Sequence, residues 1–141
     1  MQEEIKQTWH FNQPPQAVWD YLTKPELIEQ WFTKTDIQPI VGHKFRFTDK
    51  SGKIVYCEIL EVKPFTRLSY SWQFNSAKDS KPFDSKVVWT LVPKENGTEL
   101  QLVHNKFTVM EDYNAHNNGW TRLVNRFVEL LNTLKNDSAI V

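Results

Sequence analysis

Residues 119–134 have the sequence GWTRLVNRFVELLNTL, and this stretch decides the fold. Its apolar residues recur at steps of three and four, which places them on one stripe of an α-helix: Trp120, Leu123, Val124, Phe127, Leu130, Leu131 and Leu134. A lone helix of this length is only marginally stable in water, so we expect the stripe to pack against another element. Most of the remaining chain alternates like β-strand. The sequence therefore predicts one long helix that covers a sheet.

The chain begins with a predicted strand and two short helices. Apolar and polar residues alternate over residues 5–11, which indicates a strand with one buried face. The proline pair 14–15 ends this strand and suits the first turn of a helix over residues 17–22. The spacing of Thr23 and Glu26 then predicts a capping box that starts the second short helix.

From residue 43 onward, strands alternate with turns. Five segments show the alternation of a half-buried strand and predict an antiparallel meander: residues 44–47, 53–62, 68–74, 87–91 and 100–104. The pair Asn96-Gly97 is typical of a hairpin turn, residues 75–85 predict a polar loop, and residues 107–118 form a connector of undetermined shape. With the first strand, the sheet has about six strands, and the fold class is α+β.

The segment 53–62 leaves open which of its faces is buried. Its odd-numbered residues form one face and its even-numbered residues the other, and a shift of one residue in register exchanges them. Either choice points a carboxylate inward, Glu61 or Glu58. An ion pair between Glu61 and Arg67 on the next strand would neutralise the first of these.

The composition fits one domain over residues 1–141, which is long enough to bury a core without disulfides or metals. Lys and Arg together number 17, as do Asp and Glu, and this balance argues against nucleic acid or anionic membranes as partners. No apolar run is long enough to span a bilayer, and the opening MQEEIKQ carries no export segment. We therefore expect a soluble cytoplasmic protein without membrane insertion.

Motifs for metal or cofactor chemistry are missing from the sequence. The four histidines show no metal-ligand spacing, and Cys57 alone cannot complete a zinc site. The chain has no glycine-rich phosphate loop and no nucleophile elbow. We expect no metal and no cofactor, and we interpret Cys57 as an inert buried thiol.

Four stretches of the chain resemble the START-like (SRPBCC) superfamily. Residues 18–32 carry the pattern VWxxLTxPExxxxWF of its entry helices, and residues 59–72 carry ILEVxPxxRLxYxW, which is similar to its middle hairpin. Residues 97–104, GTxLxLxH, and the pair Gly119-Trp120 resemble its closing signatures. The chain looks most similar to the bacterial proteins related to the activator of the heat-shock-protein ATPase (Aha-like). This resemblance implies a helix-grip fold, in which a curved antiparallel sheet wraps around the long C-terminal helix and leaves a pocket between them.

The residues that face inward predict an apolar cavity with few polar groups, as in small-molecule sites, and a filled core is the alternative. The residues expected to bind a ligand are Trp31, Phe32, Tyr70, Trp72, Trp89, His104, Trp120, Phe127 and Leu131. Because Trp31 and Phe32 are adjacent, they cannot both point inward. We expect one of them either to lie at the entrance of the cavity or to pack as a hydrophobic staple at the corner formed by the two short helices. The bulky Phe107, where the family commonly has small residues, would narrow the pocket mouth.

His104 is the polar candidate in this set, because it shares its strand face with Leu100 and Leu102. A histidine at this position can donate to a ligand carbonyl or act as a base. The alternative is a core histidine whose hydrogen bonds are made to Tyr70 or to a backbone carbonyl.

These features lead to three hypotheses about function. The first is binding of a hydrophobic small molecule (a lipid, polyketide or flavonoid-like aromatic) without transforming it. The second is an enzyme of the cyclase, dehydratase or hydrolase type with His104 as the base. The third is a co-chaperone-like interaction module that contacts a heat-shock-protein ATPase, which only the family resemblance suggests.

Overall fold

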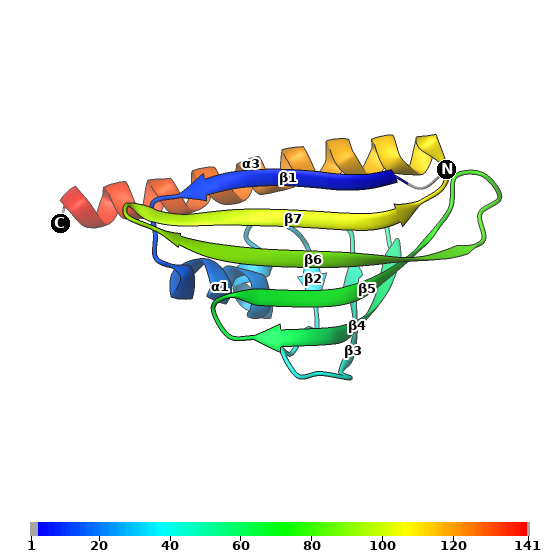
Figure 1. The fold of residues 1–141 in the computed structure, drawn as a ribbon, viewed down its shortest axis with the longest axis horizontal. Helices are drawn as coiled ribbons and strands as arrows, with labels where there is room; N and C mark the ends of the chain where they lie inside the picture. Colours follow the sequence, from blue (N-terminus) through cyan, green and yellow to red (C-terminus); the bar gives the residue numbers. More distant parts are fainter. Residues whose placement is uncertain (1–2, 141) are drawn as a thin grey trace.

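The long C-terminal helix α3, Met110–Ile140, lies along strands β1, Glu3–Phe11, and β7, Gly97–Phe107 (Figure 1). The computed structural model describes residues 3–140, with the side chains of residues 3–133. The predicted stripe is confirmed: Trp120, Val124, Phe127 and Leu131 are buried, while Leu123 and Leu130 are half-buried. The side chain of Leu134 lies outside the described residues.

Helix α3 begins at Met110 and so absorbs most of the predicted connector 107–118. Glu111 and Asp112 occupy its first turn, where negative charge complements the helix dipole. The Asp112 carboxylate also accepts hydrogen bonds from the Ser76 hydroxyl at 2.6 Å and from the Ala77 amide at 2.8 Å. The start of α3 is therefore held against the loop 76–81 between β5 and β6.

A single antiparallel sheet carries seven strands in the order β1-β7-β6-β5-β4-β3-β2. Its remaining strands are β2 Lys34–Thr35, β3 Lys44–Thr48, β4 Ile54–Lys63, β5 Arg67–Asn75 and β6 Pro82–Lys94. The predicted strands are all present, and the additional one is β2, whose two residues are too few to show a period. Among the described residues, no helix is both long enough and apolar enough to cross a membrane.

Two short helices, α1 Pro15–Thr23 and α2 Pro25–Ile28, follow β1. The predicted capping box is wrong, because the Thr23 hydroxyl donates to the carbonyl of Trp19 inside α1 at 2.9 Å. Lys24 separates the two helices with an extended backbone, φ −100° and ψ 119°. A residue before proline is driven away from helical geometry, so Pro25 sets this break.

A β-bulge in β4 settles which face of this strand is buried. Cys57 and Ile59 point into the core, the register against β5 shifts between Ile59 and Glu61, and Val62 then packs inward. The bulge leaves Glu61 on the outer surface, where its carboxylate lies 2.7 Å from Nε of Arg67. The expected Glu61–Arg67 pair is present.

Candidate functional site

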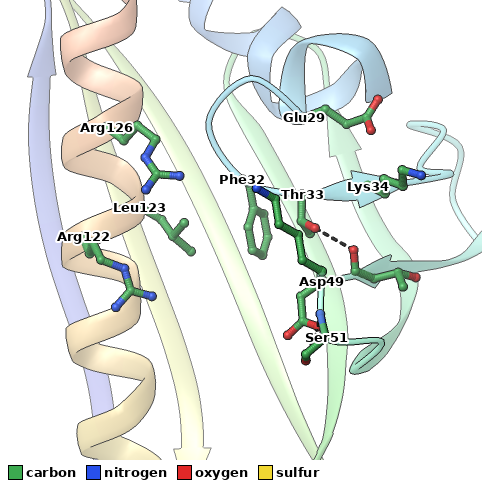
Figure 2. A pocket seen from close by; sticks show the side chains of 11 residues that line it. Glu29, Phe32, Thr33, Lys34, Asp49, Ser51, Arg122, Leu123 and Arg126 are labelled. Atoms are coloured by element: carbon green, nitrogen blue, oxygen red, sulfur yellow. Dashed lines mark hydrogen bonds between the residues drawn. The ribbon is translucent and has the colours of Figure 1, made fainter.

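A cleft of about 870 Å³ opens between α3 and the edge of the sheet formed by β2 and β3 (Figure 2). The cleft arises because α3 covers β1 and β7, whereas β2 and β3 stand at the opposite edge of the curved sheet. Its lining comes from the α2–β2 connection with the start of β2, from the end of β3 with the β3–β4 turn, and from one face of α3. These residues are Glu29, Phe32, Thr33, Lys34, Thr48, Asp49, Lys50, Ser51, Arg122, Leu123 and Arg126. The Thr33 hydroxyl donates to the carbonyl of Thr48 at 2.6 Å and joins two parts of this wall.

Phe32 forms the boundary between the cleft and the aromatic core. Its neighbour Trp31 is buried and donates its indole N–H to the carbonyl of Tyr21 at 2.9 Å, whereas Phe32 is half-buried and faces the cleft. The Phe32 ring centroid lies 5.8 Å from that of Trp120 and 6.3 Å from that of Trp72. A ligand that touches Phe32 would therefore stand one aromatic layer away from two core indoles.

Four cationic side chains line the cleft: Lys34, Lys50, Arg122 and Arg126. Figure 2 shows Arg122, Leu123 and Arg126 on the side of α3 that faces the cleft. Both arginines are exposed, and within the described part of the chain no ion pair joins any of the four cations to a carboxylate.

Two carboxylates share the lining, Glu29 and Asp49. Asp49 accepts three hydrogen bonds within its own turn, from the hydroxyl and amide of Ser51 at 2.6 Å and 2.9 Å and from the amide of Lys53 at 3.0 Å. These bonds, led by the one from the Ser51 hydroxyl, lower the pKa of Asp49. The Asp49 carboxylate is thus an ionised part of the turn, and the cleft keeps a formal excess of positive charge.

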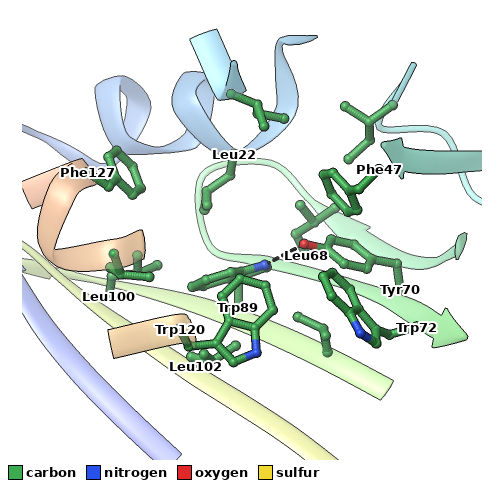
Figure 3. Close-up of a cluster of buried hydrophobic side chains, with 14 of the residues drawn as sticks. Leu22, Phe47, Leu68, Tyr70, Trp72, Trp89, Leu100, Leu102, Trp120 and Phe127 are labelled. Carbon is green, nitrogen blue, oxygen red and sulfur yellow. Dashed lines mark hydrogen bonds between the residues drawn. The ribbon is translucent and has the colours of Figure 1, made fainter. Parts of the chain in front are cut away.

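Eight of the nine predicted ligand residues lie in the buried core, and Phe32 lines the cleft. Figure 3 shows how closely the core aromatics pack. The eight buried residues are all less than a tenth exposed: Trp31, Tyr70, Trp72, Trp89, His104, Trp120, Phe127 and Leu131. Trp89 donates its indole N–H to the hydroxyl of Tyr70 at 2.9 Å, and burial raises the pKa of that hydroxyl above its ordinary value. Their role as direct ligand contacts stays a prediction.

His104 is fully buried, and both of its ring nitrogens make hydrogen bonds. Nδ1 lies 3.0 Å from the indole N–H of Trp120, which can only donate, so Nδ1 is the acceptor and the proton of the neutral ring is on Nε2. Nε2 donates to the Ser85 hydroxyl at 2.8 Å, and that hydroxyl donates to the carbonyl of Trp72 at 2.7 Å. The partners of His104 are therefore Ser85 and Trp120, rather than Tyr70 or a carbonyl as expected.

His116 extends this network. Its Nε2 accepts the indole N–H of Trp72 at 3.2 Å, and its Nδ1 donates to the carbonyl of Asp112 at 2.9 Å. Burial, together with the nearby His116, holds the pKa of His104 well below its ordinary value, and burial also lowers the pKa of His116. Two neutral imidazoles thus connect β5, β6, β7 and α3.

Phe107 packs in the same region, away from the cleft lining. It is buried, with its ring centroid 4.6 Å from that of His104 and 5.1 Å from that of His116. This aromatic contact closes the core near the start of α3. Cys57 is also buried, and burial raises the pKa of its thiol, which disfavours the reactive thiolate.

The cleft cations were not predicted as functional residues. Arg122 and Arg126 lie outside the apolar stripe of α3, and the helical pattern by itself indicates only that such residues stay solvated. Their four-residue spacing beside Leu123, at the border of the apolar stripe, was the available signal. It could not show that the edge of the sheet lies opposite this face of the helix.

Residues 12–132 match the family described as Activator of Hsp90 ATPase homolog 1-like protein. Protein MLL2253 from Mesorhizobium loti is 31% identical with a TM-score of 0.87, and the alignment covers 93% of this chain and 98% of that one. CalU16 from Micromonospora echinospora is 27% identical with a TM-score of 0.71, over 89% of this chain and 73% of that one.

A third structure, DynU16, comes from the dynemicin biosynthetic locus. It is 23% identical with a TM-score of 0.83, and it shows likeness of fold over 92% of this chain and 47% of its own length. The chain has no significant match among curated proteins. Because the family match covers most of the sequence and the Mesorhizobium loti protein aligns along nearly all of it, the chain belongs to the Activator of Hsp90 ATPase homolog 1-like family, with the helix-grip fold of the START-like superfamily.

Proposed function

We propose that this protein binds a small molecule with an apolar body in the cleft between α3 and the β2–β3 edge. The observation that supports the proposal is the half-buried ring of Phe32, which packs against the core on one side and lines a cleft of about 870 Å³ on the other. This volume lies within the range of small-molecule pockets, roughly 300–1,000 Å³. Leu123 on α3 supplies a second apolar contact in the cleft lining.

The buried residues that were predicted to bind a ligand would be affected by it indirectly, through their contacts with Phe32. Trp72 and Trp120 stand behind its ring and would sense a ligand without touching it. They become direct contacts only if Phe32 turns away and opens the cleft toward the core. The relative from the dynemicin biosynthetic locus supports a flat polyketide-like or flavonoid-like aromatic as the first ligand class to test.

A flavonoid such as naringenin, titrated into isotope-labelled protein, tests the proposal by nuclear magnetic resonance. We expect shifts in the amide signals of Phe32 and Leu123 and in the indole signals of Trp72 and Trp120. Leu123→Gln should weaken binding about tenfold, because it removes apolar contact area and places an amide there. Leu130→Gln is the matched control, since Leu130 is half-buried on the same helix but does not line the cleft. Shifts confined to other surfaces, or equal effects of the two variants, would refute the proposal.

The enzyme hypothesis receives no support from His104. Both ring nitrogens are engaged in hydrogen bonds, and the side chain is fully buried among Ser85, Trp72 and Trp120. A general base must reach a substrate proton directly or through one water, and His104 does not line the cleft.

A second proposal is contact with a heat-shock-protein ATPase through the outer face of β4. Ile54, Tyr56 and Leu60 are between 36% and 52% exposed there, and they share this face of the strand with Glu58. The description of the family supports testing this partner. Tyr56→Lys combined with Leu60→Lys should abolish pull-down of a purified bacterial heat-shock ATPase. Met110→Lys is the control, because Met110 is an exposed apolar residue at the start of α3 and lies outside β4. No pull-down by the unaltered protein would refute this second proposal.

A further inference from the structure

The cleft is electropositive in a chain whose formal charge is balanced. The whole sequence has 17 basic and 17 acidic residues, yet the cleft gathers four cations and two carboxylates. Asp49, one of the two carboxylates, is engaged by three hydrogen bonds within its turn. The excess of positive charge is therefore a local property of this site and not a reflection of the overall composition.

Arg122 and Arg126 are the centre of this charge. They stand four residues apart on α3, which places them on the same face of the helix on successive turns, where two like charges repel each other. Within the described part of the chain, neither guanidinium has a carboxylate partner. Guanidinium groups bind carboxylate, sulfate and phosphate groups through paired N–H donors, so an incoming anion would relieve this repulsion and use both side chains.

Leu123 lies between the two arginines in the sequence and lines the same cleft, opposite Phe32 (Figure 2). An apolar surface thus adjoins two unneutralised guanidinium groups. Lys50 and Lys34 extend the positive potential on the other wall of the cleft. This arrangement suits a molecule with an apolar body and a single anionic end better than a neutral apolar one.

We infer that the ligand of this cleft is an amphiphilic organic anion, whose apolar body lies on Phe32 and Leu123 and whose oxyanion group is held by Arg122 and Arg126. The inference rests on the proposed function and adds the chemical class of the ligand. A carboxylate, sulfonate or phosphate satisfies the two arginines equally, so the shared requirement is an oxyanion next to an apolar surface.

Two fluorescent probes with the same aromatic skeleton test the inference. Anilinonaphthalene sulfonate carries the anion, and phenylnaphthylamine lacks it. We expect the protein to bind the sulfonate about tenfold or more tightly than the neutral probe, because charge-assisted hydrogen bonds are roughly twice as strong as neutral ones. Added salt should reduce the difference, since both arginines are exposed to solvent. Equal affinities for the two probes would overturn the inference.

The double variant Arg122→Gln with Arg126→Gln assigns the preference to these residues. It should reduce the preference for the sulfonate from about tenfold to about twofold or less, while Arg46→Gln, at an exposed arginine on β3 outside the cleft lining, should leave it unchanged. An unchanged preference in the double variant would also overturn the inference. If Leu123→Gln fails to weaken either probe, the proposed function itself is refuted, so the two failures are distinguishable.

The anionic ligand could be a free amphiphilic acid or a lipid headgroup, and displacement of the sulfonate probe by competitors distinguishes the two. Laurate and dodecanol share an alkyl chain and differ in the carboxylate, and laurate alone should displace the sulfonate probe if a free amphiphilic acid is bound. Vesicles that contain phosphatidylglycerol should displace it only if the lipid headgroup is the source. Equal displacement by laurate and dodecanol would contradict the role of the anionic group.

Discussion

The indole N–H of Trp120 donates to Nδ1 of His104 at 3.0 Å, and this one contact fixes the chemical state of the imidazole. An indole nitrogen has no acceptor capacity, so Nδ1 carries no proton, and the neutral Nε2–H tautomer follows. The imidazole serves as a connector between the sheet and α3.

Stability should fall as the pH is lowered below about 6.5, the ordinary pKa of histidine. The folded-state pKa values of His104 and His116 are lowered, so the unfolded chain takes up protons that the folded chain resists. Each histidine then removes at most about 1.4 kcal/mol of unfolding free energy per pH unit between the unfolded and the folded pKa. Urea unfolding from about pH 7.5 down to about pH 5 measures this. In His116→Asn the slope should be shallower, and a slope equal to that of the unaltered protein would contradict the assignment.

Replacing His104 by Phe should destabilise the protein by about 2–4 kcal/mol, because it leaves the Trp120 donor and the Ser85 hydroxyl without their buried partner. Chemical unfolding gives the magnitude. Binding of the naphthalene probes should stay within about twofold, since His104 does not line the cleft. A large loss of binding with unchanged stability would instead support the direct ligand role first expected for this residue.

Two glycines provide a paired test of the fold. Gly97 has φ 143°, and a Cβ there would lie 1.9 Å from the carbonyl oxygen of Phe11. Gly97→Ala should therefore destabilise the protein by at least about 2 kcal/mol. Gly119 is inside α3 with open space around its Cβ position, so Gly119→Ala should stabilise by about 0.5–1 kcal/mol. Thermal unfolding separates the two, and a stabilised Gly97 variant would refute the close approach.

Phe32→Ala should open the cleft toward the indoles of Trp72 and Trp120. We expect a loss of about 1–3 kcal/mol of stability, less than for a fully buried phenylalanine, because Phe32 is half-buried. A bulky apolar probe should then quench the tryptophan fluorescence of the variant more strongly than that of the unaltered protein, because it can touch the two indoles directly. Phe83→Ala is the control, because Phe83 is half-buried against Phe74 and does not line the cleft. Equal quenching in the two variants would count against the boundary role of Phe32.

Much of the scaffold could be predicted from the sequence, because long periods leave strong signals. The helical stripe from Trp120 to Leu131 and the alternation in β5 and β7 each extend over several repeats. Local exceptions were not predictable in the same way. The spacing of Thr23 and Glu26 predicted a capping box, but Pro25 ends the first helix at that point. The bulge between Ile59 and Glu61 changes the inward face of β4 within one strand.

The candidate site was harder to predict because it depends on elements that are distant in the sequence. A helical wheel identifies Arg122 and Arg126 as solvated, but it says nothing of the β3–β4 turn that faces them. Phe32 could be placed near an entrance only through its neighbour Trp31. Whether the interior behind Phe32 is filled or hollow depends on how several aromatic rings pack together. A list of inward-facing residues does not contain that information.

On α3, Leu123 and Val124 are consecutive, yet the first lines the cleft and the second is fully buried. One face of α3 therefore stabilises the fold, and the neighbouring face sets the chemistry of the cleft. Substitutions at the exposed positions 122 and 126 change stability by only about 0.5 kcal/mol or less, whereas the buried stripe tolerates few changes. Relatives with this scaffold can thus acquire different chemical preferences through a few surface replacements, without any reconstruction of the interior.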